Sequence, residues 1–366
     1  MNFHSSVAAL ALACLAVAPV ARAQTPAPAP APTQAPAKLK VGDAAPALSI
    51  ESFVKGTPVT TLEKGKTYLL HFWAPWNKAS LEQLQILSEV QKNYADKKLV
   101  VIGIASTDVT GTTIEKVKTA ITDKGGAVEF AIAWDKGTET KDAFLKAAGR
   151  STLPCAVIVD KEGKVAFIEN ALLGLQFLDA VTAGTHDLAA MAAWQTKAER
   201  APQTLKSLAT AYQARKWAEV LSYSTELLEV DPVGYGGNAQ VRMLAQGKSG
   251  AADKAIEWAK AWVDGPGKNS PEGLNAVAWV LVDPKEPFPK QDLDLALKAA
   301  TRAAELTKNE DGAILDTVAR VHFLKGDVAK AVEIQKMALL KLKPAQAQFK
   351  TQIEAALKEY EAALPK

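Results

Sequence analysis

Between residues 40 and 183, short apolar runs alternate with stretches in which apolar residues recur at helical spacing. The apolar runs are 68–74, 99–105, 127–134, 156–159 and 165–168. Runs of this length with few polar residues are typical of strands covered on both faces of a sheet. The helical stretches follow residue 74 and span 112–123 and 138–148. This alternation predicts an α/β domain over 40–183, with helices on both faces of its sheet.

Residues 184–366 show a different pattern, in which helical periodicity predicts helices arranged in pairs. Similar segments begin near residues 202, 238, 271 and 312, which are 36, 33 and 41 residues apart. The longest step contains a proline-rich insertion at 283–289. One helix pair cannot bury its own apolar stripe, so at least three pairs must stack. We therefore expect an all-α solenoid over 184–366, closed by a terminal helix at about 345–363.

The pattern of the N-terminal residues predicts a targeting signal followed by a linker. The apolar run 7–20 is too short to span a bilayer as a helix and ends in the small-x-small site Ala21-Arg22-Ala23. We predict a cleaved signal peptide over 1–23 and a periplasmic or secreted protein. A lipoprotein signal at Cys14 is the alternative, although Ala11-Leu12-Ala13 ahead of it fits that pattern poorly. Prolines alternate with small residues in 24–39, which favours an extended, semi-rigid linker.

Composition narrows the classes of function. Hydrophobic residues are 48% and charged residues 23% of the 366, which excludes a wholly disordered chain. Lysine and arginine number 43 against 40 acidic residues, so the net charge of +3 favours no nucleic-acid partner. We expect no metal and no cofactor, because no His/Cys cluster has ligand spacing and no glycine-rich segment forms a phosphate-binding loop. No apolar run after the leader is long enough to predict a membrane span.

Two segments of 40–183 carry a family resemblance. Residues 72–76, Phe-Trp-Ala-Pro-Trp, stand between a strand and a helix, and Leu153-Pro154 precedes the strand and turn around Asp160. With the opening 41–46, Val-Gly-Asp-Ala-Ala-Pro, this resembles thioredoxin-like proteins, closest to the extracytoplasmic thiol-disulfide reductases and the peroxiredoxin-related group. The resemblance implies a cis-proline at Pro154, beside which such folds bind extended peptides. It also implies two cysteines in the helix that follows Trp76.

The chain departs from this pattern where the chemistry would occur. Asn77 and Ser80 stand in place of the two cysteines. Thiol–disulfide exchange needs a thiolate, which neither a carboxamide nor a serine hydroxyl supplies. Asn77 suits the N-cap of the following helix instead. We interpret His71, at the position of a buried acid in thioredoxins, as a hydrogen-bonded core histidine rather than a proton carrier.

Cys155 is the single cysteine left once the predicted signal peptide is removed. It directly follows Pro154 and begins an apolar run, so we predict that it is a small buried residue. The alternative is a lone reactive thiol that forms mixed disulfides with a partner.

The helical segments resemble tetratricopeptide repeats, most clearly over 207–232 and 314–344. In the latter, five small or apolar residues match the packing positions of that family: Leu315, Ala319, Gly326, Ala331 and Ala338. The resemblance implies that four residues of its first helix face a protein or peptide ligand: Ala313, Asp316, Arg320 and Phe323. The alternative is that these four are ordinary surface residues.

Together these features predict a secreted or periplasmic protein with a redox-inactive thioredoxin-like domain and a repeat domain that binds a protein or peptide. We expect it not to be an enzyme. The first alternative is an oxidoreductase-related enzyme that uses the thiol of Cys155. A chaperone-like holdase is a second alternative.

Overall fold

The computed structural model describes residues 38–123 and 128–365 of the chain. The predicted signal peptide 1–23 lies outside the described residues, and so does the predicted linker up to residue 37.

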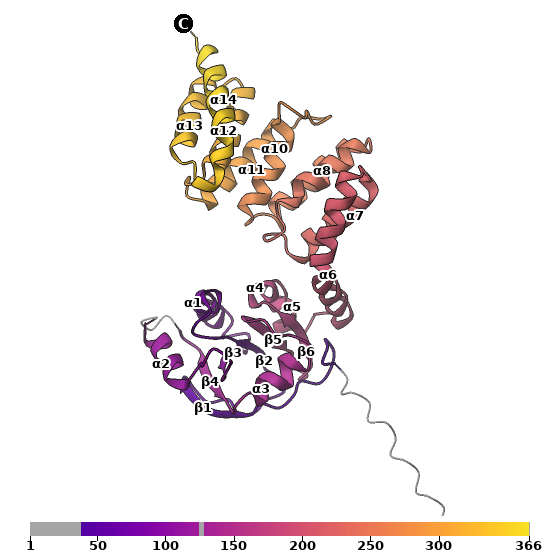
Figure 1. The fold of residues 1–366 in the computed structure, drawn as a ribbon. Coiled ribbons are helices and arrows are strands. Elements are labelled where there is room, and N and C mark those ends of the chain that lie inside the picture. Colours follow the sequence, from indigo (N-terminus) through magenta and orange to yellow (C-terminus); the bar gives the residue numbers. More distant parts are fainter. Residues whose placement is uncertain (1–37, 124–127, 366) are drawn as a thin grey trace, which may run out of the picture. The chain divides into compact units, whose positions relative to one another are not determined.

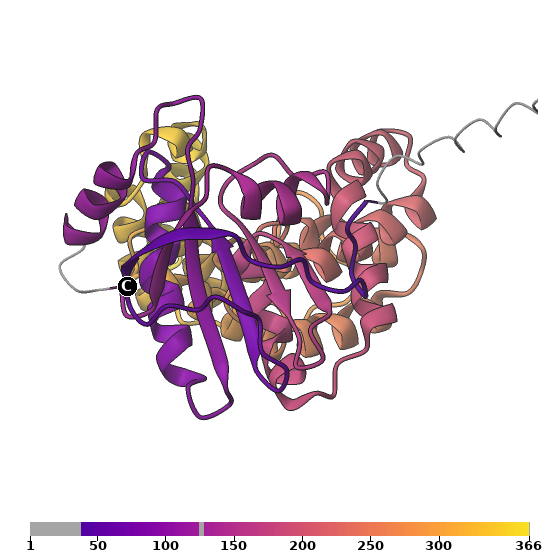
Figure 2. The ribbon, with the colours of Figure 1, turned by 90° about the horizontal axis from the view of Figure 1, so that it is seen from below.

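The first part of the described chain forms a six-stranded mixed sheet in the order β1-β4-β3-β2-β5-β6 (Figures 1 and 2). The strands are β1 (Ile50–Lys55), β2 (Thr67–Phe72), β3 (Leu99–Ala105), β4 (Ala131–Asp135), β5 (Cys155–Val159) and β6 (Val165–Glu169). Strands β2, β3 and β4 run parallel, whereas β1, β5 and β6 join antiparallel to their neighbours. The five apolar runs that predict strands all contribute one, which confirms the α/β class.

Strand β1 has no counterpart among the predicted runs. It lies at the edge of the sheet and pairs with β4 alone, through a register broken by irregularities. Its residues are half-buried or exposed, so its sequence lacks the continuous apolar run of the central strands. An edge strand of this kind carries little of the hydrophobic signal on which strand prediction rests.

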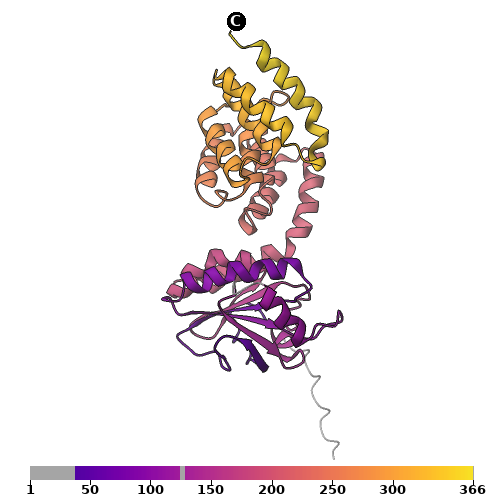
Figure 3. The same ribbon diagram turned by 90° about the vertical axis from the view of Figure 1, so that its left-hand side faces the viewer.

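Helices cover the two faces of the sheet unequally. The helical elements of this part of the chain are α1 (Lys78–Asn93), α2 (Ile114–Asp123), α3 (Glu139–Lys141), η1 (Asp142–Lys146), α4 (Ala171–Gly174), η2 (Leu175–Phe177) and α5 (Leu178–Ala183). Apolar side chains of α1, α2 and α5 form one core with the sheet, and Figure 3 shows α1 along this face. On the other face, Phe144 and Leu145 of η1 pack with Phe72 and Val157. The predicted helix 138–148 is therefore split, with one turn of α3 followed by the π-helical turn η1.

All regular elements after residue 184 in the described chain are helices. They are α6 (Leu188–Gln213), α7 (Trp217–Val230), α8 (Asn238–Lys248), α9 (Ala252–Asp264), α10 (Pro271–Val282), α11 (Leu293–Leu306), α12 (Gly312–Leu324), α13 (Val328–Leu340), η3 (Pro344–Phe349) and α14 (Lys350–Ala362). Consecutive helices α6 to α13 contact each other in pairs, and α14 packs on α13 and α12. This confirms the all-helical second half. No helix within the described ranges is both long and apolar enough to cross a membrane.

Helix α6 contributes to two hydrophobic cores. Met191 is buried in the core beneath the sheet, whereas Ala201, Leu208 and Ala211 are buried against α7. Between them, the Trp194 ring lies 5.5 Å from the ring of Phe167 in β6, and its Nε1 donates to the Glu229 carbonyl of α7 at 3.3 Å. The sheet and the first helix pair therefore share one continuous helix.

Candidate functional site

The candidate site is the corner where β2 ends and α1 begins, opposite the loop before β5. Asn77 adopts an extended backbone conformation and caps α1, since its Oδ1 accepts a hydrogen bond from Ser80 N at 2.9 Å. Its Nδ2 donates to the Leu153 carbonyl at 3.0 Å. The Leu153–Pro154 peptide bond is cis. One carboxamide therefore ties the start of α1 to the loop that carries Pro154.

Ser80 is fully buried one turn into α1. Its Oγ lies 3.5 Å from the amide nitrogen of Ala74, the residue that leaves β2. The hydroxyl therefore faces the protein interior and is not presented to a substrate.

His71 lies in β2 and is also fully buried. Burial lowers the pKa of His71 to about 3, and the nearby backbone of Ser80 offsets only part of this effect. The imidazole is neutral at physiological pH. His71 is therefore a buried core residue, as predicted, but among the described residues neither ring nitrogen has a hydrogen-bond partner within normal geometry. The sequence cannot show this, because the core around His71 is apolar only once the sheet and α1 have packed together.

Trp76 stands at the surface of the same corner, with 53% of its area exposed. Its Nε1 donates to Asp108 Oδ2 at 2.8 Å, in the loop after β3. Asp108 also accepts hydrogen bonds from the backbone and hydroxyl groups of Thr110 and Thr112. Burial opposes ionisation of Asp108, but these bonds together hold its pKa well below the usual range. Trp76 is therefore an exposed aromatic held in one orientation.

The sequence analysis does not single out Asp108 as a residue of this site. The signal was present as Asp-Val-Thr-Gly-Thr at 108–112, a spacing that favours a side-chain-capped turn. What the sequence lacked was any indication that this turn would reach Trp76, 32 residues earlier.

A pocket of about 550 Å³ opens beside Trp76 between the starts of α1 and α2. Its wall includes Pro75 and Leu81 from the corner and Thr112, Glu115 and Lys116 from the α2 side. Its surface is mainly apolar, with polar side chains among the lining residues, and no cysteine lines it.

Cys155 begins β5 and is 3% exposed. Burial raises the pKa of Cys155 to about 12; the Glu169 carboxylate adds to this rise, whereas the Arg150 guanidinium opposes it. At neutral pH the group is a protonated, covered thiol.

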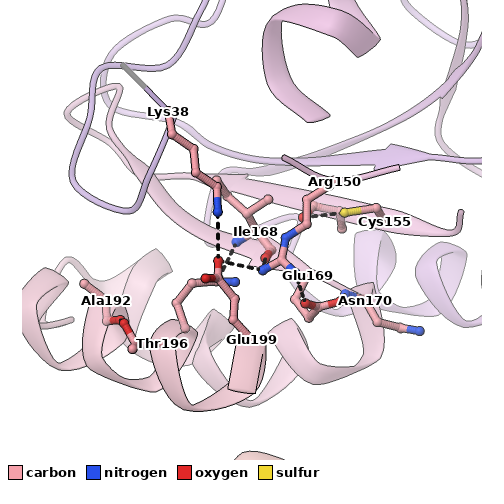
Figure 4. A network of polar contacts seen from close by, with 11 residues as sticks. Lys38, Arg150, Cys155, Ile168, Glu169, Asn170, Ala192, Thr196 and Glu199 are labelled. Atoms are coloured by element: carbon pink, nitrogen blue, oxygen red, sulfur yellow. Dashed lines mark hydrogen bonds and ion pairs between the residues drawn. The ribbon is translucent and has the colours of Figure 1, made fainter. Parts of the chain in front are cut away.

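A network of ion pairs surrounds this position (Figure 4). Arg150 pairs with Glu169 at 3.0 Å and with Glu199 of α6 at 3.2 Å, and Lys38 lies 3.8 Å from Glu199. The Arg150 and Glu169 side chains are only 18% and 25% exposed, so their pairing is screened less by solvent than a surface pair. The network fastens α6 over the edge of the sheet near Cys155.

The four residues predicted to face a ligand on α12 do not form an open surface. Asp316 is buried and accepts from Gln335 Nε2 at 2.6 Å, Arg320 pairs with Glu359 at 3.2 Å, and Phe323 stacks on Tyr360 at 4.3 Å. Ala313 is half-buried in the first turn, where its amide donates to the capping residue Asp311. Helix α14 covers most of this face, through Glu359 and Tyr360. A pocket of about 190 Å³ remains, lined by Asp316 and Arg320 with residues that include Trp279 and Tyr360.

In the parts of the chain that the structure describes, no group of three or more His, Cys, Asp and Glu side chains is arranged to hold a metal ion. The candidate site therefore consists of the corner, its rigid tryptophan and the neighbouring pocket.

Comparison with known proteins finds similarity in the sheet-containing half. A model of the AhpC/TSA family matches residues 41–168. Protein FixW of Rhizobium leguminosarum is 24% identical over 151 residues, which are 40% of this chain and 68% of that protein. The thiol-disulfide oxidoreductase ResA of Bacillus thuringiensis subspecies konkukian is 30% identical over 129 residues, covering 35% of this chain and 68% of the relative. The thioredoxin domain of a thiol-disulfide oxidoreductase from Bacteroides vulgatus is 24% identical and has a TM-score of 0.33, with 39% of this chain and 99% of that domain covered.

Replacing Asn77 tests the two bonds of its carboxamide. We expect Asn77→Ala to lower the free energy of unfolding by about 2 kcal/mol, because both the helix cap and the bond to Leu153 disappear. Asn77→Asp keeps an acceptor at a helix N-terminus, where negative charge is favourable, and should lose only about 1 kcal/mol. Urea unfolding measures both values. An equal loss in the two variants would contradict a contribution from the cap.

The burial of Cys155 predicts slow labelling by iodoacetamide in the native protein. Because a thiol reacts as the thiolate and the pKa lies near 12, the native rate should stay low between about pH 7 and pH 9.5. Protein unfolded in guanidinium serves as the control and should react rapidly above about pH 8.5. Rapid native labelling at pH 8 would show that the thiol is accessible.

Proposed function

The chain belongs to the thioredoxin-like thiol-disulfide oxidoreductase family, and on that premise we propose that it is a redox-inactive member that binds a protein or peptide. The proposal is carried by the corner at the start of α1, where this chain has Asn77 and Ser80 and the family resemblance implies two cysteines. The relative ResA is a thiol-disulfide oxidoreductase by name. This chain keeps their scaffold without their nucleophile.

The chemistry of the corner supports the loss of exchange. The Asn77 carboxamide has no ionisable proton, and both of its ends are occupied by Ser80 N and the Leu153 carbonyl. The Ser80 hydroxyl is buried. Cys155 does not substitute for them, since its thiol is covered and protonated at neutral pH. A residual enzyme that uses Cys155 is therefore the weaker alternative.

The same contacts support assigning partner binding to the helical half. The family resemblance implies that an extended peptide binds beside the cis-proline. Here the Leu153 carbonyl already accepts a hydrogen bond from Asn77. We propose that the helix pairs α6 to α13 are tetratricopeptide repeats and that the pocket of Trp279, Asp316 and Arg320 belongs to their binding surface. The apolar leader 1–23 supports a periplasmic or secreted location.

Restoring the thiols tests redox inactivity. The wild-type chain should not accelerate the reduction of insulin by dithiothreitol, whereas Asn77→Cys/Ser80→Cys should do so, because it places a Cys-x-x-Cys at a helix N-terminus beside a cis-proline. Asn77→Cys alone is the matched control and should not reach the rate of the double variant. Clear turnover by the wild type would refute the proposal.

Capture from a periplasmic extract tests binding by the helical half. Immobilised full-length chain should retain a defined set of proteins, and Trp279→Ala should lose them because the pocket loses its aromatic wall. Trp217→Ala, a truncation at another half-buried tryptophan of the helical half, controls for general destabilisation. If the wild type, Trp279→Ala and Trp217→Ala retain the same extract proteins, this pocket is not part of the binding surface.

A further inference from the structure

Arg242 of α8 is a buried cation without an acidic partner. The residue is 8% exposed, and no carboxylate of the described chain lies within ion-pair distance of its guanidinium. Three other arginines of the helical half, Arg200, Arg302 and Arg320, each pair with a glutamate. Removing a charge from water without an opposite charge is unfavourable, so this arrangement needs a reason.

Neutral groups hold the guanidinium in one position. Its Nε donates to Thr225 Oγ1 of α7 at 3.1 Å, and its Nη1 donates to Gln246 Oε1 of α8 at 2.8 Å. Its central carbon lies 3.8 Å from the centre of the Trp258 ring of α9, which itself stacks on Trp262. Three helices therefore orient the cation, and none of these contacts neutralises it.

One end of the guanidinium is unused. Nη2 has no hydrogen-bond partner among the described residues, and it is not one of their fully enclosed, unpartnered atoms. The carboxylate with a resolved electrostatic influence on Arg242 is Glu229, and Glu229 is engaged by Lys197 at 2.7 Å. Burial lowers the pKa of Arg242 to about 10, with Glu229 opposing, so the group still carries its charge at neutral pH.

We propose that Arg242, fixed by Thr225, Gln246 and Trp258, binds a carboxylate of an acidic peptide segment at the surface where α7, α8 and α9 meet. Nη2 and the second N–H of Nη1, the first being used by Gln246, match the two oxygens of a carboxylate, and the fixed orientation reduces the entropy lost on binding. The site is separate from the pocket on α12. The inference deepens the proposed function, on which it rests, by naming an acidic partner for the helical half.

A variant with its own carboxylate provides the sharpest test. Gln246→Glu places a carboxylate on Nη1, which Arg242 already uses to contact this residue, so the internal ion pair should neutralise the guanidinium while the protein stays folded. The probe is a fluorescein-labelled hexaglutamate peptide, with hexaglutamine as the uncharged control, measured by anisotropy on the full chain. We expect Gln246→Glu to weaken hexaglutamate binding about tenfold or more, and Arg242→Gln to do the same. Gln213→Glu, which adds the same charge at an exposed position of α6, should leave binding unchanged.

The outcomes separate this site from the proposed function. Loss of hexaglutamate binding in both Arg242→Gln and Gln246→Glu, with thermal stability retained in Gln246→Glu, supports the site. Absent binding by wild type, equal binding by Gln246→Glu, or equally tight binding of inorganic phosphate overturns it. If Gln246→Glu retains the same extract proteins as the wild type, the acidic-peptide site fails and the proposed function stands. If the wild-type chain reduces insulin, the proposed function fails whatever hexaglutamate does.

Discussion

The contact on which the candidate site depends is the double hydrogen bond of the Asn77 carboxamide. Its oxygen satisfies a first-turn amide of α1, and its nitrogen satisfies the carbonyl ahead of the cis-proline. A helix start and a tight loop both leave backbone groups without partners, and one neutral side chain serves both. The carboxamide that stabilises the corner thus stands at the position that the family resemblance assigns to a cysteine, and the proposed loss of thiol–disulfide exchange rests on this substitution.

Burial favours the uncharged form of two further groups that could react, His71 and Cys155. The His71 imidazole is kept neutral and the Cys155 thiol is kept protonated, because an apolar interior disfavours the charged form of each. Around Cys155, the pairing of Arg150 with Glu169 and Glu199 closes the sheet edge under α6 (Figure 4). These charged side chains hold α6 against the sheet. In the helical half, by contrast, Arg242 keeps a charge that no acid of the described chain neutralises.

Local pattern was sufficient for most of the fold. Strands β2, β3, β5 and β6 are covered on both faces, so they appear in the sequence as apolar runs, and the helices show their amphipathic spacing. Strand β1 was missed because an edge strand packed on one side lacks that run. The residues of α12 that the repeat resemblance turns toward a ligand are mostly covered by α14, and repeat position alone does not tell whether a later helix covers that face.

The sequence by itself determined the class of each half and the absence of paired cysteines after Trp76, because apolar periodicity and residue identity are local properties. The tertiary structure decided which distant polar groups meet: Trp76 with Asp108, Asn77 with Leu153, and Arg242 with Thr225 and Trp258. It also decided which titratable groups lose water. Desolvation and hydrogen-bond pairing depend on what surrounds a side chain in space, and spacing along the chain does not encode those neighbours.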